Sequence, residues 1–292
     1  MSEKAEKIEA FISLKDEALV NESAAQYSLA VQLGVDFVTF CILDAEKKKF
    51  LFLETYSFQG ENNMVMISEC IQKIVAINPL LQSEFKNTFI SYVNQKSTLI
   101  PLPLYSEGHK VDYFKINHAL EKGMRLHTDK IQILEAVNIY AIPDVVENNM
   151  SKLFPTAKAN HFSTTLIESS LVKYRNHTKK VAIVHVQLST FEIVIVNGKN
   201  LNFYNSFTIK TPEDFVYYIL FVFEQLKLNT NSIEIVLCGQ IIRNSELYAL
   251  LFKYVKHIRF DERDNTFQFS YVFEEIPRHF YSNLFYQFKC VL

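Results

Sequence analysis

Residues 179–214 read KKVAIVHVQLSTFEIVIVNGKNLNFYNSFTIKTPED, and this stretch decides the fold. Its β-branched and aromatic residues predict strands over residues 181–188, 191–196 and 201–209. The dipeptide Asn197-Gly198 predicts a type I′ hairpin turn between the last two, because both central residues of that turn take positive φ. Three consecutive antiparallel strands are therefore expected.

A helix is predicted directly after these strands. Residues 211–214, Thr-Pro-Glu-Asp, form a capping box with proline at the first helical position. Residues 215–226 are apolar nearly all round, which predicts a helix covered on most sides. The continuous apolar run 233–237 predicts a strand central in a mixed sheet. The rest of the chain predicts a helix over 245–254, strands over 255–260 and 267–273, and a last helix that begins at Pro277.

A weaker copy of the same order occupies residues 27–77. Strands are predicted over 27–33, 37–43 and 50–58. A helix follows from Met64 and ends near Asn78, because the residue before a proline avoids the α region. Gln32 and His185 hold the same place in the two first strands, an offset of 153 residues. This repeat predicts two related halves.

The segment between the two copies is less regular. Residues 1–25 are expected to be a short polar helix or lead-in. The predicted strands are 88–93, 97–104, 137–142 and 157–161, and the predicted helices are 111–120, 143–154 and 163–174, the last with Ser163 as N-cap. The expected domains are residues 1–176, with an elaborated segment about 80–135, and residues 177–292, with the C-terminal helix packing across the halves.

Composition excludes several classes of protein. The 292 residues are 49% hydrophobic, with 25 Phe, 15 Tyr and no Trp, and the net charge of −2 lacks the basic footprint of a nucleic-acid-binding protein. The first ten residues do not resemble a signal peptide. The longest apolar run is too short for a bilayer, which needs ~20 residues. Cys41, Cys70, Cys238 and Cys290 stand singly, as expected for reduced thiols. A globular cytoplasmic protein without a membrane span is expected.

Four stretches resemble a known family. They are Ile139-Tyr-Ala-Ile-Pro143, then Leu153-Phe-Pro155 with His161, then residues 181–196, and then residues 233–240. In these stretches the chain resembles uncharacterised bacterial proteins with an actin-like ATPase fold. It is more distantly similar to the degenerate actin-like clamp proteins of pilus and secretion machines. The resemblance spans nearly the whole chain and implies an α/β fold of two ribonuclease-H-like mixed sheets, with helices on their faces and a cleft between them.

The resemblance also implies where a nucleotide would bind. Active members have two Asp-x-Gly loops that approach the phosphates and position the metal, and a Gly-Gly pair against the adenosine. Here the first loop is Gln32-Leu-Gly34, the second spans His185 to Thr190 without aspartate or glycine, and the third is Gly239-Gln240. The candidate cleft residues are Gln32, Gly34, His185, Gln187, Ser189, Gly239 and Gln240. No catalytic or metal-binding residue is assigned.

Two functions remain open. The missing carboxylates and glycines favour a non-catalytic, degenerate actin-like protein that acts as an intracellular protein-binding or assembly module without a cofactor. Its partner would be an unidentified protein or a second copy of the chain. The alternative is a nucleotide-binding ATPase or kinase-like enzyme that uses Gly34, Ser189 and Gly239 with ATP and Mg²⁺. His185 is interpreted as a core or cleft histidine rather than a general base, and Asp36 as a loop residue without metal-binding companions.

The aromatic residues of 267–288 have two interpretations. Most are expected in the core, and an excess would form an exposed patch for a partner. The alternating stretch 267–273 would then offer a strand edge to another chain.

Overall fold

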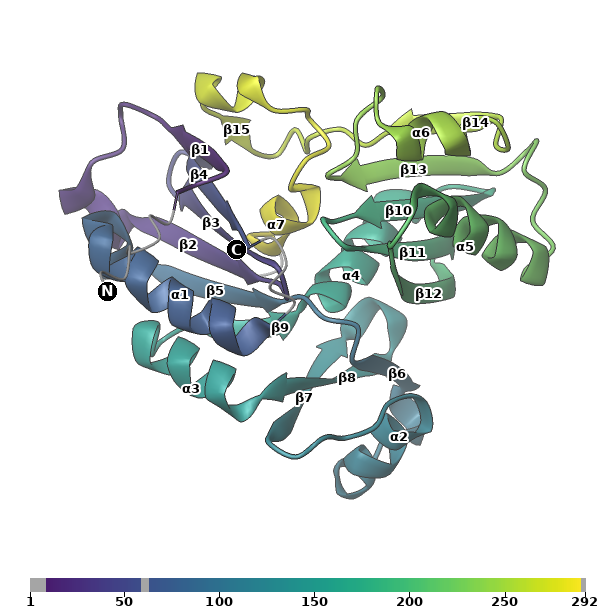
Figure 1. Cartoon of the computed structure of the whole chain (residues 1–292), viewed down its shortest axis with the longest axis horizontal. Coiled ribbons are helices and arrows are strands. Elements are labelled where there is room, and N and C mark those ends of the chain that lie inside the picture. Colours follow the sequence, from purple (N-terminus) through teal and green to yellow (C-terminus); the bar gives the residue numbers. More distant parts are fainter. Residues whose placement is uncertain (1–8, 59–62, 290–292) are drawn as a thin grey trace, which may run out of the picture.

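The computed structural model describes residues 9–58 and 63–289. Residues 1–8 and Cys290 lie outside this range. Two larger mixed sheets and one small antiparallel sheet make up the molecule (Figure 1). The predicted mixed α/β class is confirmed.

The first sheet has the strand order β1-β4-β3-β2-β5-β9, with β15 added beside β4. The strands β1, β4, β3 and β2 are antiparallel to their neighbours, while β2, β5 and β9 run parallel. The bounds are β1 Ile12–Lys15, β2 Tyr27–Leu33, β3 Phe37–Asp44, β4 Lys49–Ser57, β5 Asn87–Tyr92, β9 Lys158–His161 and β15 Gln268–Phe269.

The second sheet repeats this arrangement with the order β12-β11-β10-β13-β14. Its first three strands are antiparallel and its last three parallel. The bounds are β10 Lys180–Val186, β11 Thr190–Asn197, β12 Asn200–Thr208, β13 Glu234–Gly239 and β14 His257–Phe260. Gln32 pairs with Thr39 in the first sheet and His185 pairs with Glu192 in the second, so both pairs are related by the offset of 153. The doubling of the chain remains a prediction, which this shared order supports.

The small sheet has the strand order β6-β8-β7. Strands β6 and β7 lie within the elaborated segment, and β8 follows that segment directly. Its bounds are β6 Ser97–Pro101, β7 Met124–Ile131 and β8 Ala136–Pro143, and helix α2, Lys110–Asn117, packs against it. β7 was not predicted, because its sequence MRLHTDKI is polar and lacks clean alternation. The strand forms through its antiparallel ladder with β8.

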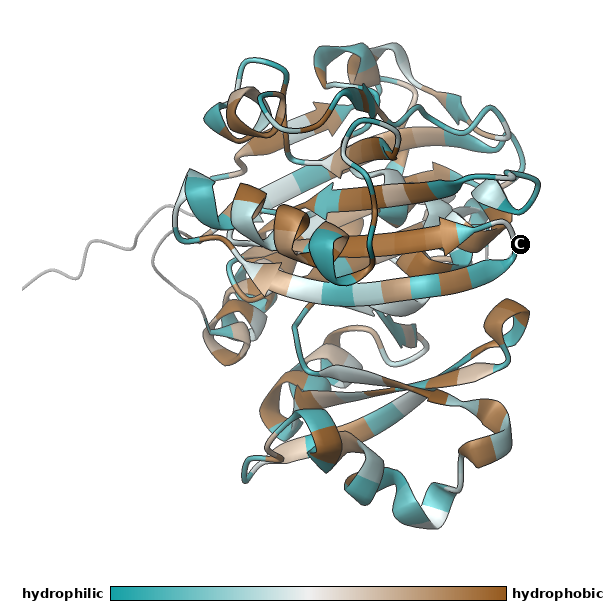
Figure 2. Ribbon diagram, turned by 90° about the vertical axis from the view of Figure 1, so that its right-hand side faces the viewer, coloured by the Kyte–Doolittle hydropathy of each residue, from teal (hydrophilic) through white to brown (hydrophobic). Residues whose placement is uncertain are grey.

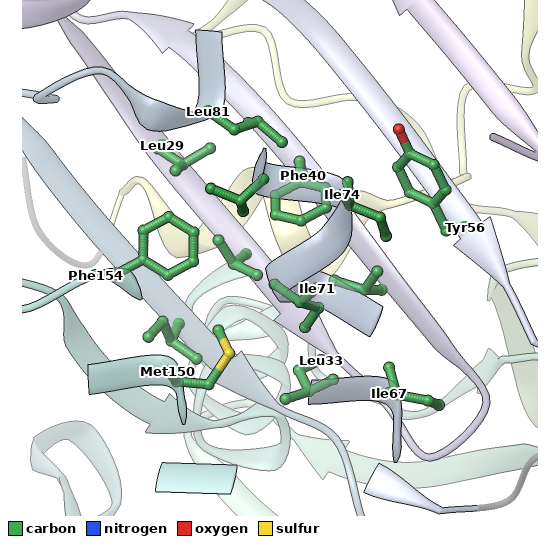
Figure 3. Packing of buried hydrophobic residues seen from close by; sticks show 14 of the residues in the cluster. Leu29, Leu33, Phe40, Tyr56, Ile67, Ile71, Ile74, Leu81, Met150 and Phe154 are labelled. Atoms are coloured by element: carbon green, nitrogen blue, oxygen red, sulfur yellow. The ribbon is translucent and has the colours of Figure 1, made fainter. Parts of the chain in front are cut away.

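Helices cover the sheets and connect the halves. They are α1 Met64–Ile77, α3 Asp144–Leu153, α4 Phe162–Tyr174, α5 Pro212–Gln225, α6 Glu246–Leu251 and α7 Ser282–Gln287. α1 buries Ile67, Ile71 and Ile74 against Leu29, Leu33 and Phe40 of the first sheet (Figure 3). Figure 1 shows α4 and α7 between the two larger sheets. No helix within the two described ranges is long and apolar enough to span a membrane.

The second sheet is mostly hydrophobic along its strands, while its connecting turns are hydrophilic (Figure 2). α5 begins as predicted. Thr211 accepts a hydrogen bond from the backbone N–H of Asp214, and the Asp214 side chain accepts one from the backbone N–H of Thr211. This capping box satisfies two N–H groups that the first helical turn leaves without partners.

The aromatic C-terminal segment is core and not a strand with a free edge. Only Gln268–Phe269 pairs with β4, and residues 271–275 form a 3-10 turn. The ring of Phe50 is surrounded by those of Phe267, Phe269, Phe273, Phe285 and Phe288, with centroids 4.6–6.4 Å apart. Because these rings fill the space above Phe50, the predicted strand over 267–273 is confirmed only at Gln268–Phe269 and is wrong over the rest. Tyr271, 64% exposed, is the exception to the burial.

Four further local predictions are wrong. Residues 12–15 form β1 and residues 21–26 a 3-10 helix, where one polar helix or lead-in was expected. The hairpin turn is shifted by one residue. Asn197 pairs with Asn200, so the two central residues are Gly198 and Lys199 and not Asn197 and Gly198. Of these two central residues, Gly198 takes positive φ, +57. The N-cap of α4 is His161, whose ring accepts from the Ser163 N–H. The last helix begins at Ser282 after a left-handed Tyr281, rather than at Pro277.

Candidate functional site

The first two candidate loops meet between the halves. The β2–β3 turn carries Asp36, and the side chain of Ser189 from the β10–β11 turn lies near enough to oppose the rise in the pKa of Asp36 that burial causes. A cavity of about 310 Å³ lies beside this contact. Its wall includes Asp36 and Phe37 from the first half, Gln187 and Glu192 from the second, and Lys96 from the segment after β5. Of the seven predicted cleft residues, Gln187 lines this cavity, and Ser189 reaches it through Asp36.

The glycine of the first loop is covered by a side chain. The N–H of Gly34 donates to the carbonyl of Phe37 at 2.9 Å. A Cβ at position 34 would lie 2.3 Å from the Phe37 ring, so the ring rests directly on the glycine. Phe37 is buried among apolar residues that include Val93 and Phe162. The close approach that Gly34 permits is therefore used by Phe37. Gln32 is buried in β2 opposite Thr39.

The second loop is a tight hairpin turn. The N–H of Gln187 donates to the carbonyl of Thr190 at 2.8 Å. His185 is 5% exposed, and its ring packs edge-on against Phe162 with centroids 4.9 Å apart. Its Nδ1 atom lies 3.7 Å from Oε2 of Glu192, too far for a hydrogen bond. His185 is therefore a buried core histidine, one of the two predicted alternatives, and it does not line the cavity.

The third loop is occupied by the C-terminal segment. Gly239, at φ +77, donates its N–H to the carbonyl of His279 at 3.0 Å, and Gln240 donates its own to the carbonyl of Val186 at 2.7 Å. Nε2 of His279 lies 2.6 Å from the carbonyl of Ile241 and must donate there, since a carbonyl oxygen only accepts. Burial lowers the pKa of His279, which is consistent with a neutral ring. The backbone groups of this loop thus already have partners within the chain.

The cleft contains two carboxylates that the sequence analysis did not place there. Glu192 is 2% exposed on β11, and Asp36 is 8% exposed on the β2–β3 turn. Burial raises the pKa of Asp36, and the side chain of Ser189 opposes that rise. The expectation of a groove without carboxylates is therefore wrong. The signal was a lone Glu in the apolar run TFEIVIV, because a buried acidic residue in a central strand needs a partner.

The described residues contain no group of three His, Cys, Asp or Glu side chains placed to hold a metal ion. Glu121 also lines the cavity, but Nζ of Lys96 lies 2.6 Å from its Oε1. Among residues 9–58 and 63–289, Asp36 and Glu192 are therefore the carboxylates of the cavity wall that form no ion pair with a lysine or arginine.

A second polar cluster lies where β7 and β8 meet the first sheet. Tyr140, Phe154 and Pro155, from the stretches that carry the resemblance, line a cavity of about 410 Å³ there. Asp129 lines it too. Its Oδ2 accepts from the His161 backbone N–H and the Thr164 hydroxyl, both at 2.7 Å. Burial raises the pKa of Asp129 to about 6.

His161 itself is neutral with a defined tautomer. Its Nδ1 accepts from the N–H of Ser163 at 3.2 Å, so this nitrogen carries no proton. Its Nε2 therefore carries the proton and donates to the carbonyl of Asn94 at 3.1 Å. Burial lowers the pKa of His161 to about 3.

Comparison with known proteins supplies a family and a fold. Residues 16–258 match the model of a family described as "Protein of unknown function (DUF3822)". No curated protein sequence matches the chain significantly. Among solved structures, the chain is similar to a protein of Bacteroides thetaiotaomicron VPI-5482 with an actin-like ATPase fold and unknown function. The two are 22% identical, with 83% of this chain and 93% of that chain covered and a TM-score of 0.74.

The chain is also similar to the structure of a PilM–PilN type IV pilus biogenesis complex. Here the identity is 10%, the coverage is 91% of this chain and 98% of that chain, and the TM-score is 0.57. At such identities a structural likeness establishes the fold and leaves the function to be argued from the site. The predicted actin-like ATPase fold is confirmed.

Proposed function

The chain belongs to the DUF3822 family, and we propose that it is a non-catalytic, degenerate actin-like protein that acts as an intracellular protein-binding or assembly module. The observation that carries the proposal is the state of the three loops. Phosphate-binding loops depend on free backbone N–H groups and on close approach at glycine. Here the Phe37 ring lies on Gly34, and the N–H groups of Gly34 and Gly239 donate to carbonyls of the chain itself.

The charges of the cavity wall support the same proposal. A triphosphate needs cations or N–H donors around it. The wall instead carries Asp36, Glu121 and Glu192, with Lys96 already paired to Glu121. No third acidic, histidine or cysteine side chain joins Asp36 and Glu192 to form a metal site within the described residues. This cleft fits a metal-bound triphosphate poorly.

An exposed aromatic surface supports a role in binding protein. Tyr217 and Phe221 on α5 are 60% and 45% exposed, and their rings stack with centroids 6.0 Å apart. Phe252, next to the end of α6, is 59% exposed. Exposed apolar patches of this kind mark interaction surfaces. The structurally similar PilM is found in a complex with a protein, PilN. By analogy we place the partner, or a second copy of the chain, on the α5–α6 surface.

Calorimetric titration of ATP with Mg²⁺ tests the proposal. We expect no binding heat and no phosphate release, while an actin-like ATPase measured in parallel gives both. Micromolar binding of ATP together with phosphate release would overturn the proposal that the protein is non-catalytic.

The second candidate is an ATPase or kinase-like enzyme of the same fold. The observation that favours it is the presence of Asp36 and Glu192 in the cleft, because carboxylates position metal and water in phosphoryl transfer. If the titration gives turnover, Asp36→Asn should abolish it, and this candidate then replaces the first.

A further inference from the structure

Glu192 is a buried carboxylate whose hydrogen bonds are all long. Its nearest donors are Nε2 of Gln187, at 3.3 Å from Oε2 and 3.4 Å from Oε1, and the hydroxyl of Ser206, at 3.3 Å from Oε1. Ordinary hydrogen bonds to oxygen have heavy-atom distances of about 2.7–3.2 Å for N–H donors and about 2.5–3.0 Å for O–H donors. A charge that is 98% removed from solvent is costly unless it is paired or bonded at such distances. Glu192 therefore has capacity for a further donor.

Gln187 provides an independent sign of a missing ligand. The residue is 6% exposed and lines the same cavity. Its amide N–H group faces Glu192, which leaves Oε1 as an acceptor, and that atom is buried without a hydrogen-bond partner. Most buried polar atoms in proteins are bonded. Two residues of the second sheet thus line one cavity, Glu192 with only long hydrogen bonds and Gln187 with an acceptor atom that has none.

The first half contributes a third acceptor. Asp36 lines the cavity, and the side chain of Ser189 lies near enough to oppose the rise of its pKa. Glu121 and Lys96 form a close ion pair and cancel each other, so Asp36 and Glu192 give the cavity a negative potential. Three further titratable groups lie near Glu192. Nδ1 of His185 is 3.7 Å from Oε2 of Glu192 and makes no hydrogen bond to it, and the negative charge of Glu192 helps to raise the pKa of Tyr204 and Cys238.

We propose that this cavity binds a primary ammonium or guanidinium group, with Glu192, Asp36 and Gln187 as its acceptors. These groups carry several N–H donors, which match two carboxylates and one amide oxygen. A metal ion fits less well, because the described residues contain no three-ligand His, Cys, Asp or Glu set. The same head group occurs in free small amines and in Lys or Arg side chains of a protein. The inference does not depend on the proposed function, since a cation site can exist with or without a protein partner.

Calorimetric titration of the full chain tests the inference. The free amines are cadaverine and agmatine, the side-chain mimics are Nα-acetyl-lysine methylamide and Nα-acetyl-arginine methylamide, and 1-pentanol is the neutral control. We expect saturable binding of at least one amine and none of the alcohol. Tighter binding of the free amines identifies a small-molecule ligand, and tighter binding of the mimics identifies a protein side chain.

Glu192→Gln is the decisive variant. It should weaken amine binding by about tenfold or more, since one charged acceptor is lost. Without ligand it should also raise Tm by roughly 2 °C, because removal of an under-partnered buried charge relieves its desolvation. Glu147→Gln is the matched control. Oε2 of Glu147 lies 2.8 Å from Nη1 of Arg125 in the other polar cluster, so this variant should keep amine binding and should not gain stability.

The inference is overturned if no amine binds at millimolar concentration, if Mg²⁺ binds and amines do not, or if Glu192→Gln binds them as tightly as the wild type. If Glu192→Gln fails to fold, Asp36→Asn takes its place with the same expected loss of binding. The ATP titration has a separate readout, so either proposal can fail alone.

Discussion

Replacing Asp129 by Asn should make the stability of the protein more sensitive to acid. Asp129 is held at the junction of β7 with β9 and α4 by the His161 N–H and the Thr164 hydroxyl. Asn keeps the shape and an acceptor oxygen but cannot titrate. The variant therefore isolates the contribution of one partly buried carboxyl group to the pH dependence of unfolding.

The direction in which the pKa of Asp129 is shifted decides whether this group adds stability or removes it as the pH falls. Burial raises the pKa of Asp129 from its ordinary value of 3.8 to about 6. The folded state therefore binds a proton more tightly than the unfolded state, and stability is gained as pH falls through about 6 and is complete below 3.8. The difference between the two values corresponds to about 3 kcal/mol when complete, and to about 2 kcal/mol between pH 7 and pH 4.

His161 acts in the opposite direction. Burial lowers its pKa from 6.5 to about 3, so its contribution to stability is present above 6.5 and is lost as pH falls toward 3. By pH 4 this loss amounts to about 3 kcal/mol. In the wild type the two neighbouring groups nearly cancel. In Asp129→Asn the loss from His161 stands without the gain from Asp129.

Urea unfolding followed by circular dichroism at pH 7, 6, 5 and 4 measures the effect. The free energy of unfolding of Asp129→Asn, relative to the wild type, should fall by about 2 kcal/mol from pH 7 to pH 4. Asp144→Asn, at a half-exposed position at the start of α3, removes the same charge near solvent and should alter the slope much less. A constant difference between Asp129→Asn and wild type over this range would refute the reasoning.

Two further predictions follow from packing. Gly239→Val should lower the free energy of unfolding by more than about 2 kcal/mol, because Gly239 has φ +77 and a Cβ there would lie 2.1 Å from the Val186 carbonyl oxygen. Loss of ligand binding with an unchanged urea midpoint would contradict this prediction. The double variant Phe221→Ser with Phe252→Ser should abolish self-association, measured by sedimentation velocity, or co-purification of a partner from the native host. The control Ile116→Ser changes a 73% exposed apolar side chain on α2 and should affect neither measurement. Equal behaviour of the two variants would remove the α5–α6 surface from consideration.

Sequence patterns predicted the elements whose signals are local. The alternation of residues 181–196 and the capping box at Thr211 correspond to β10, β11 and α5. Such elements are specified by side-chain period and by hydrogen bonds a few residues apart, so a short window contains the information. β7 and residues 267–273 failed for the opposite reason. β7 is a strand because it pairs with β8. Residues 267–273 form only a short strand because their phenylalanine rings pack against the ring of Phe50.

The candidate site divides in the same way. The sequence located the three loops, since turns after strands are locally encoded, and Gln187 does line the cleft. It did not indicate that the Phe37 ring covers Gly34 or that the carbonyl of His279 accepts the N–H of Gly239, because these contacts depend on packing. The roles of Glu192 and Asp36 also escaped, since their shared cavity joins β11 of one half to the β2–β3 turn of the other.

The amino-acid sequence alone determined most of the strands and helices of this protein, because hydrophobic period and turn chemistry act over neighbouring residues, but it did not indicate β1 or β7. Only the tertiary structure decided what the cleft can hold. Whether the N–H of Gly239 is free, or which carboxylates share a cavity, depends on residues far apart in the sequence that meet when the sheets and the C-terminal segment pack together, such as Gly239 with His279 and Asp36 with Glu192.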